Sequence, residues 1–179
     1  MTKKNITKPI EITERIRERW EETGYKCVAE VSENEDIIKQ DIILCVEACF
    51  KECPIAYIVI WFYDHGISQS YYREHFRTFR QVYISRDCVI YRIYPGDDLK
   101  IITSVWGECD ILDIIFFRDD QDSQPFIGNL LGRSYKEYRK DFFKRVSASQ
   151  VIISDSGDGN EFQMIFSEGL YEKLQCLHT

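Results

Sequence analysis

The stretch "IAYIVIWF", residues 55 to 62, decides the fold of this chain. All of its residues are apolar or aromatic, and it lacks the apolar–polar alternation of a strand with one face in water. Its β-branched and aromatic residues favour a strand. We therefore expect residues 55 to 62 to form a strand that is buried on both faces of a sheet.

Helical periodicity precedes this strand. Apolar residues recur at helical spacing before Gly24, and again from residue 35 to 52, where Pro54 ends the second helix. A short strand is expected at 26–31, between the two helices. We expect residues 1–8 to form a flexible basic arm.

The middle of the chain predicts one helix and several strands. Aromatic residues share one stripe of a helix expected at 70–82. Two β-rich runs around a Pro-Gly turn, at 88–94 and 99–106, predict a hairpin. A third strand is expected at 111–117, followed by an acidic loop at 118–125.

The last part of the chain predicts one more helix and a second hairpin. Ser134 and Glu137 stand in the pattern of a capping box, which opens a helix to about residue 145. Two strand-like runs flank a turn at 155–160, and a short helix closes the chain. This order indicates one α+β domain, residues 9–179. Its mixed, mainly antiparallel sheet (a β-meander plus a C-terminal hairpin) is packed by about four to five helices.

The overall charge of the chain is negative, with a formal net charge of −7 and a pI of about 5.1. An acidic chain repels the nucleic-acid backbone and favours basic partners, so we expect no nucleic-acid binding. The seven cysteines are odd in number and the N-terminus lacks a signal-peptide core, which indicates a cytoplasmic protein. No apolar run approaches the roughly 20 residues that span a bilayer, so we expect no membrane insertion.

Asp64 and His65 follow the central strand and raise the question of a catalytic site. An Asp and a His at a strand end can act as a base and the group that orients it. Adjacent residues of an extended strand point to opposite faces, so this pair reaches one site only through a turn. We favour a turn that ends the strand, and the spacing of the three histidines matches no zinc signature.

Cys45, Cys49 and Cys53 stand four residues apart and stack on one face of the second predicted helix. The outer two thiols would lie about 12 Å apart along the helix axis. One tetrahedral zinc ion, with Zn–S bonds of about 2.3 Å, does not reach both of them. We favour a packed helix face, and expect no metal and no cofactor; a turn before Pro54 leaves a metal site as the alternative.

Acidic residues concentrate in two segments. Residues 87–125 hold nine acids and three bases, and residues 11–36 hold nine acids and four bases. Such carboxylates can form a solvated surface, a Mg²⁺ or Ca²⁺ site, or a surface that steers a basic protein into place. For the last case the candidate steering acids and aromatic anchors are Asp97, Asp98, Glu108, Asp110, Asp119, Asp120, Asp122, Tyr94 and Trp106.

A basic helix expected at 133–145 follows Gly128 and Gly132. A glycine-containing loop before a helix N-terminus can hold phosphate. In the order of its elements, the segment 111–145 resembles the GNAT family of N-acetyltransferases, whose pyrophosphate loop reads Q/R-x-x-G-x-G/A. The resemblance implies an acyl-coenzyme A-dependent enzyme. The nearest stretch here begins at Gln124; its first glycine comes one position late and its second is missing.

No motif in the sequence is specific for a chemical reaction, so we assign no catalytic residue. The composition favours a non-catalytic acidic binding protein. An immunity protein or inhibitor that neutralises a basic partner, such as a bacterial toxin with nuclease activity, has these properties. A small acyl-coenzyme A-dependent N-acyltransferase-like enzyme and a structural module that forms homo-oligomers are the alternatives.

Overall fold

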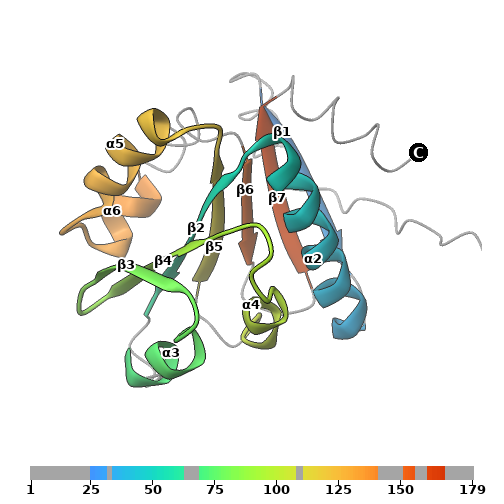
Figure 1. The fold of residues 1–179 in the computed structure, drawn as a ribbon, viewed down its shortest axis with the longest axis horizontal. Coiled ribbons are helices and arrows are strands. Elements are labelled where there is room, and N and C mark those ends of the chain that lie inside the picture. Colours follow the sequence, from blue (N-terminus) through green and yellow to red (C-terminus); the bar gives the residue numbers. More distant parts are fainter. Residues whose placement is uncertain are drawn as a thin grey trace, which may run out of the picture.

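A seven-stranded sheet forms the centre of the protein (Figure 1). The computed structural model describes residues 25–31, 34–62, 69–107, 111–140, 151–155 and 161–167. Along the sheet the strands follow the order β1-β7-β6-β5-β2-β4-β3. Their bounds are β1 Tyr25–Val31, β2 Ile55–Trp61, β3 Arg80–Ile84, β4 Cys88–Ile93, β5 Ile111–Phe117, β6 Val151–Asp155 and β7 Glu161–Ser167.

Every pair of neighbouring strands in this sheet is antiparallel. The α+β fold is confirmed, and the sheet is wholly antiparallel where the sequence indicated a mixed one. The predicted C-terminal hairpin is β6–β7. The predicted strand at 26–31 is β1, which pairs with β7 at one edge of the sheet.

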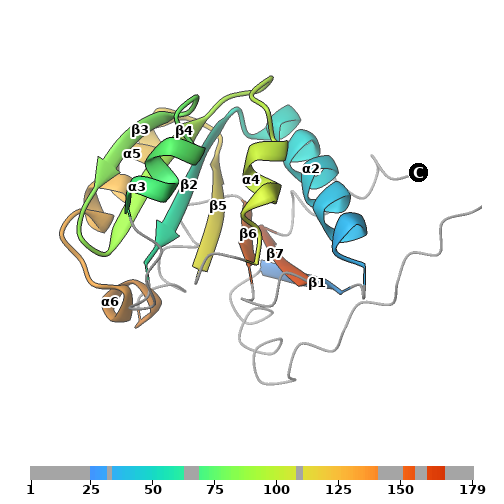
Figure 2. The ribbon, with the colours of Figure 1, turned by 90° about the horizontal axis from the view of Figure 1, so that it is seen from below.

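Helices cover both faces of the sheet (Figure 2). One face carries α2 (Glu35–Glu52), α3 (Gln69–His75) and α4 (Lys100–Ser104). The opposite face carries α5 (Asp120–Leu130) and α6 (Tyr135–Lys140). None of the helices in the described part of the chain has the length and hydropathy needed to cross a membrane.

The stretch 55–62 supplies β2 near the middle of the sheet, as predicted. Every residue of this strand is buried. Even-numbered residues of β2 pack under α2, α3 and α4, and odd-numbered residues pack under α5 and α6. Because both faces of β2 are covered, the stretch has no polar alternation.

The aromatic stripe predicted one helix over residues 70–82, and this prediction is wrong. The helix α3 ends at His75, and Arg80 opens β3, which pairs with β4 at the sheet edge. Phe76 and Phe79 are buried in the turn between the two elements. The aromatic stripe therefore continues as core packing after the helix has ended.

The predicted strand at 99–106 is wrong, since Lys100–Ser104 form the helix α4. Asp98 accepts a hydrogen bond from the Lys100 amide at the start of this helix, and Ile102 packs into the core below it. Tertiary packing here overrides the strand propensity of the β-branched residues. The expected meander is therefore a β3–β4 hairpin, with β5 on the far side of β2.

The predicted acidic loop at 118–125 is also wrong, since most of it belongs to α5. Asp119 is the N-cap of this helix, and its Oδ1 accepts the Asp122 amide at 3.0 Å. Phe126 and Leu130 bury one side of α5 against the sheet. An N-cap followed by acidic residues is a sequence signal for a helix start, which the loop interpretation overlooked.

The capping box at the start of α6 is present as predicted. The Ser134 amide and hydroxyl each donate to Glu137 Oε2 at 2.9 Å, and the Glu137 amide donates back to Ser134 Oγ at 3.4 Å. The predicted arm at 1–8 and the helices predicted at the two ends of the chain lie outside the described residues.

Candidate functional site

The acidic residues that follow β4 and those that follow β5 lie at the same end of the sheet. Ala56 of β2 is paired with Ile93 of β4 on one side and with Phe116 of β5 on the other. The chain therefore leaves β4 and β5 at the same end of the sheet, on either side of β2. We call the described carboxylates that follow these strands the acidic edge: Asp97, Asp98, Asp119, Asp120 and Asp122.

Several carboxylates of the acidic edge bind backbone amides of their own segment. Asp97 Oδ2 accepts the Tyr94 amide at 2.7 Å, and Asp98 and Asp119 accept amides at the starts of α4 and α5. Asp122 is exposed, and its side chain makes no hydrogen bond or ion pair with any described residue. Of these carboxylates, Asp122 is the one that we consider first as a contact for a partner.

Asp120 pairs with Arg92, which reaches it from β4 across β2. Arg92 Nη1 lies 3.2 Å from Asp120 Oδ1 and 3.5 Å from the Tyr57 hydroxyl. The guanidinium carbon lies 5.6 Å from the ring centre of Tyr57 and 5.3 Å from that of Tyr94. The side chain of Arg92 is 18% exposed and that of Asp120 is 60% exposed, so the pair lies at the boundary between core and solvent.

Tyr94 is the exposed aromatic residue of this end, at 38% exposure. Its hydroxyl forms a hydrogen bond with Arg80, which raises the pKa of that guanidinium. Arg80 is the cross-strand partner of Arg92, so Tyr94 contacts two arginines whose positions are directly opposed. Like charges at such positions repel, and Asp120 offsets this repulsion.

The acidic edge is close to charge balance with its surroundings. Its five carboxylates lie near four bases of these segments and the adjoining strands, which gives a balance of −1 when the buried Asp113 of β5 is left out; the bases are Arg80, Arg92, Lys100 and Arg118. The helix α2 carries five acids and two bases, a charge of −3. Among the described residues, α2 is therefore the more negative element.

Trp106 does not have the exposed position expected of an anchor. Its side chain is 2% exposed and packs in the core on the α2 face of the sheet. Of the two proposed anchors, Tyr94 alone keeps an accessible ring. The candidate steering residues Glu108 and Asp110 lie outside the described residues.

Asp113 belongs to the acidic segment 87–125 but lies in the core, at 1% exposure. Its Oδ2 accepts a hydrogen bond from the Tyr138 hydroxyl at 2.6 Å, and its Oδ1 accepts one from Ser154 Oγ at 2.5 Å. The three residues come from β5, α6 and β6. The sequence held a signal for this burial, because Asp113 interrupts a run of apolar residues in a strand.

Cys88 of β4 and Trp61 of β2 lie on the same sheet face as Asp113. Burial, and then the charge of Asp113, raise the pKa of the Cys88 thiol. The Trp61 ring centre lies 5.0 Å from that of Tyr138, and the buried indole Nε1 makes no hydrogen bond with any residue that the structure describes. A raised thiol pKa disfavours a nucleophilic thiolate. This buried cluster holds α6 on the sheet and presents no activated nucleophile.

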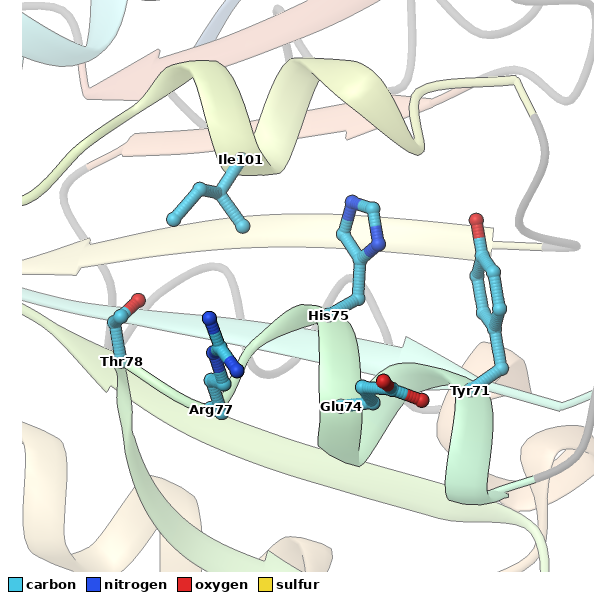
Figure 3. Close-up of a pocket in the computed structure, with 6 residues that line it drawn as sticks. All are labelled: Tyr71, Glu74, His75, Arg77, Thr78 and Ile101. Carbon is cyan, nitrogen blue, oxygen red and sulfur yellow. The ribbon is translucent and has the colours of Figure 1, made fainter.

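A groove of about 440 Å³ opens between α3 and α4 (Figure 3). Its lining residues are Tyr71, Glu74, His75, Arg77, Thr78 and Ile101.

The groove holds a close His–Ser contact. His75 Nε2 lies 2.7 Å from Ser104 Oγ, and Ser104 Oγ donates to the Ile101 carbonyl at 2.7 Å. Since the serine proton goes to the carbonyl, His75 donates to Ser104. A general base that activates serine must accept that proton instead, so the contact links the two helices and is not a nucleophilic pair.

Cys45 and Cys49 of α2 and its C-cap residue Cys53 lie on the packed side of the helix, with Cys49 and Cys53 buried and Cys45 half-buried. Burial, and then the neighbouring thiols, raise the pKa of Cys49. In the described part of the chain, no group of three His, Cys, Asp or Glu side chains is arranged to hold a metal ion. The burial of Cys49 and Cys53 in the core supports the packing interpretation of this helix face.

Of the two glycines that precede the basic segment, Gly132 lies in the turn before α6, and Gly128 does not. Gln124 and Gly128 both lie within α5. Gly132 follows that helix with a φ of +75°, a conformation that favours glycine. The phosphate-binding loop that the resemblance implies is therefore not formed at Gln124–Gly128. Asp64 and His65 lie outside the described residues.

Sequence reasoning missed Arg80 and Arg92, because their opposition depends on how β3 and β4 pair. The Tyr138–Asp113 link was missed for the same reason, since it joins segments 25 residues apart. No protein-family model, no curated protein and no solved structure matches this chain.

Proposed function

We propose that this protein is a non-catalytic binding protein that captures a basic protein partner, in the way an immunity protein neutralises a toxin such as a nuclease. The observation that supports this most is that the acidic residues after β4 and after β5 lie together beside the exposed Tyr94. Tyr94 lies against Arg92 and is surrounded by charged residues. Tyrosine and arginine are enriched at the centres of protein interfaces, and the rims of interfaces are polar.

In this proposal, charge acts on the partner both at long range and at short range. The net charge of −7 attracts a basic partner at long range and speeds its encounter. At short range the acidic edge is nearly balanced, so selectivity comes from the placement of single carboxylates such as Asp122. The ring of Tyr94 then loses its remaining exposure to water against the partner.

The surroundings of the cysteine and histidine side chains also support a binding role. Burial raises the pKa of the Cys88 and Cys49 thiols, which keeps them protonated near neutral pH. His75 donates its hydrogen bond to Ser104 and does not activate that hydroxyl. These groups serve packing and helix contacts, which favours binding over catalysis.

The test is to copurify the full chain with the proteins encoded beside its gene, and then to measure association rates with the partner recovered. A double variant, Asp119→Asn with Asp122→Asn, removes two charges of the acidic edge, while asparagine keeps the N-cap of α5. The matched control, Asp36→Asn with Glu47→Gln, removes two exposed charges from α2.

We expect association with the acidic-edge variant to be about tenfold slower at low salt, with a smaller difference at high salt. The α2 variant should slow association less. Equal effects of the two variants would show that net charge alone attracts the partner. If no neighbouring protein binds at any ionic strength, the proposal is wrong.

A further inference from the structure

The groove between α3 and α4 holds an acid and a base that do not pair. Glu74 and Arg77 both line it and both are exposed. Neither side chain makes a hydrogen bond or an ion pair with any described residue, and the same is true of the Thr78 hydroxyl. The groove therefore offers one carboxylate, one guanidinium and one hydroxyl to a ligand.

Two rings and one aliphatic side chain stand beside these charges. The rings of Tyr71 and His75 stack at 5.4 Å with 21° between their planes, and both point into the groove (Figure 3). The contact of His75 with Ser104 fixes this ring against α4. Ile101, which is half-buried, supplies an aliphatic surface on the opposite wall.

Glu74 and Arg77 are three residues apart in the chain and both line the groove. The Arg77 amide donates to the Glu74 carbonyl at 3.4 Å, so the two residues lie on the turn at the end of α3. Side chains three residues apart on a turn start about 5–6 Å from each other. Such a spacing suits a ligand whose positive and negative groups are separated by two bonds.

We propose that this groove binds a free α-amino acid with an aromatic or branched apolar side chain. Its carboxylate meets Arg77 and the Thr78 hydroxyl, and its ammonium group meets Glu74. Its side chain lies against Ile101 and the Tyr71–His75 stack. A groove of about 440 Å³ lies within the range of small-molecule sites, and its open side predicts an affinity in the millimolar range. This inference is independent of the proposed partner capture.

The test is a titration of the ¹⁵N-labelled full chain, followed by amide NMR, with three probes that share one ring. L-phenylalanine carries both charges, 3-phenylpropanoate lacks the ammonium group and 2-phenylethylamine lacks the carboxylate. We expect L-phenylalanine to shift the amides of 71–78 and 101–104 in a saturable way. Each analogue should bind about tenfold more weakly, since one charge-assisted hydrogen bond is lost.

Single variants show which group of the ligand each of the two charged side chains binds. Arg77→Gln and Glu74→Gln should each weaken L-phenylalanine about tenfold, and Arg77→Gln should leave 2-phenylethylamine unchanged. Arg73→Gln is the matched control, because Arg73 is an exposed base of α3, four residues before Arg77, that does not line the groove. Unchanged amide spectra away from the groove show that each variant is folded.

Two results would overturn the inference. One is the absence of saturable shifts at 71–78 and 101–104 with L-phenylalanine up to about 20 mM, a concentration that covers the affinity expected of an open groove. The other is equal binding of all three probes, which would mean that the aromatic stack binds the ring and that the two charges recognise nothing.

Discussion

The hydroxyl of Tyr138 on α6 donates a hydrogen bond to Asp113 on β5, with 2.6 Å between the two oxygens, inside the core of the protein. Both side chains are 1% exposed. A carboxylate so deeply buried is stable when hydrogen bonds replace its contacts with water. The link therefore ties the position of α6 to the middle of the sheet.

Replacing Tyr138 by phenylalanine removes one of these hydrogen bonds and keeps the ring against Trp61. A hydrogen bond to a charged group contributes about 1.5–3 kcal/mol, so we expect the free energy of unfolding to fall by about 2 kcal/mol. Urea unfolding should show a lower midpoint with an unchanged slope. A variant as stable as the parent protein would contradict a role for this hydrogen bond in stability.

Tyr91→Phe provides the matched control, because the buried Tyr91 hydroxyl forms no hydrogen bond within the described part of the chain. The ring keeps its stacking on Phe76, at 5.2 Å between centres. Removal of an unsatisfied polar group leaves stability unchanged or raises it by up to about 1 kcal/mol. A large loss of stability in urea unfolding would show that this hydroxyl has a partner in solution.

The same Tyr91 gives a prediction at alkaline pH. Burial raises its pKa from 10.0 to about 12, although Arg73 lowers it in part. Between these values the unfolded chain has lost the proton that the folded protein keeps. Its contribution to stability is therefore complete below pH 10 and is lost as the pH rises towards 12. Tyr91→Phe should lose stability less steeply in this window, as measured by urea unfolding at a series of pH values.

The Arg92–Asp120 pair predicts unequal costs for its two partners. Arg92→Lys removes the planar group that contacts the rings of Tyr57 and Tyr94, and we expect a loss of about 1–2 kcal/mol. Asp120→Asn should cost less than about 1 kcal/mol, because the carboxylate is largely exposed. Denaturant unfolding of both single variants and of the double variant measures the coupling.

Arg86→Lys is the control for that comparison, since Arg86 lies 4.0 Å from Asp87 and is 92% exposed. We expect no measurable change in its unfolding midpoint. If Arg92→Lys were equally neutral, the stacking of Arg92 on the two tyrosine rings would contribute nothing to stability.

The buried thiols predict a resistance to alkylation. Burial raises the pKa of Cys88 and of Cys49 above the ordinary value for a thiol, so little thiolate forms at pH 8 in the folded protein. With iodoacetamide under native conditions, peptides that contain these residues should stay unmodified, and in urea they should react fully. Mass spectrometry measures both states. Rapid native alkylation of Cys88 would contradict its placement in the core.

The sequence by itself determined the elements whose local pattern and tertiary environment agree. The unbroken apolar run at 55–62 required a covered strand, because nothing in it tolerates water, and the structure buries all of β2. The helix at 35–52 has a stripe that faces the core and a proline after its end, and α2 has these bounds. The capping box of Ser134 and Glu137 is local chemistry, and it opens α6.

Tertiary structure alone decided the elements in which local preference competes with packing. Residues 100–104 have the β-branched composition of a strand, yet they are helical, because Ile102 and the buried Trp106 fill the core beside α2. The site depends on strand order in the same way. β2 pairs with both β4 and β5, and this pairing brings Arg92 to Asp120. Residue spacing along the chain carries no record of which strands become neighbours.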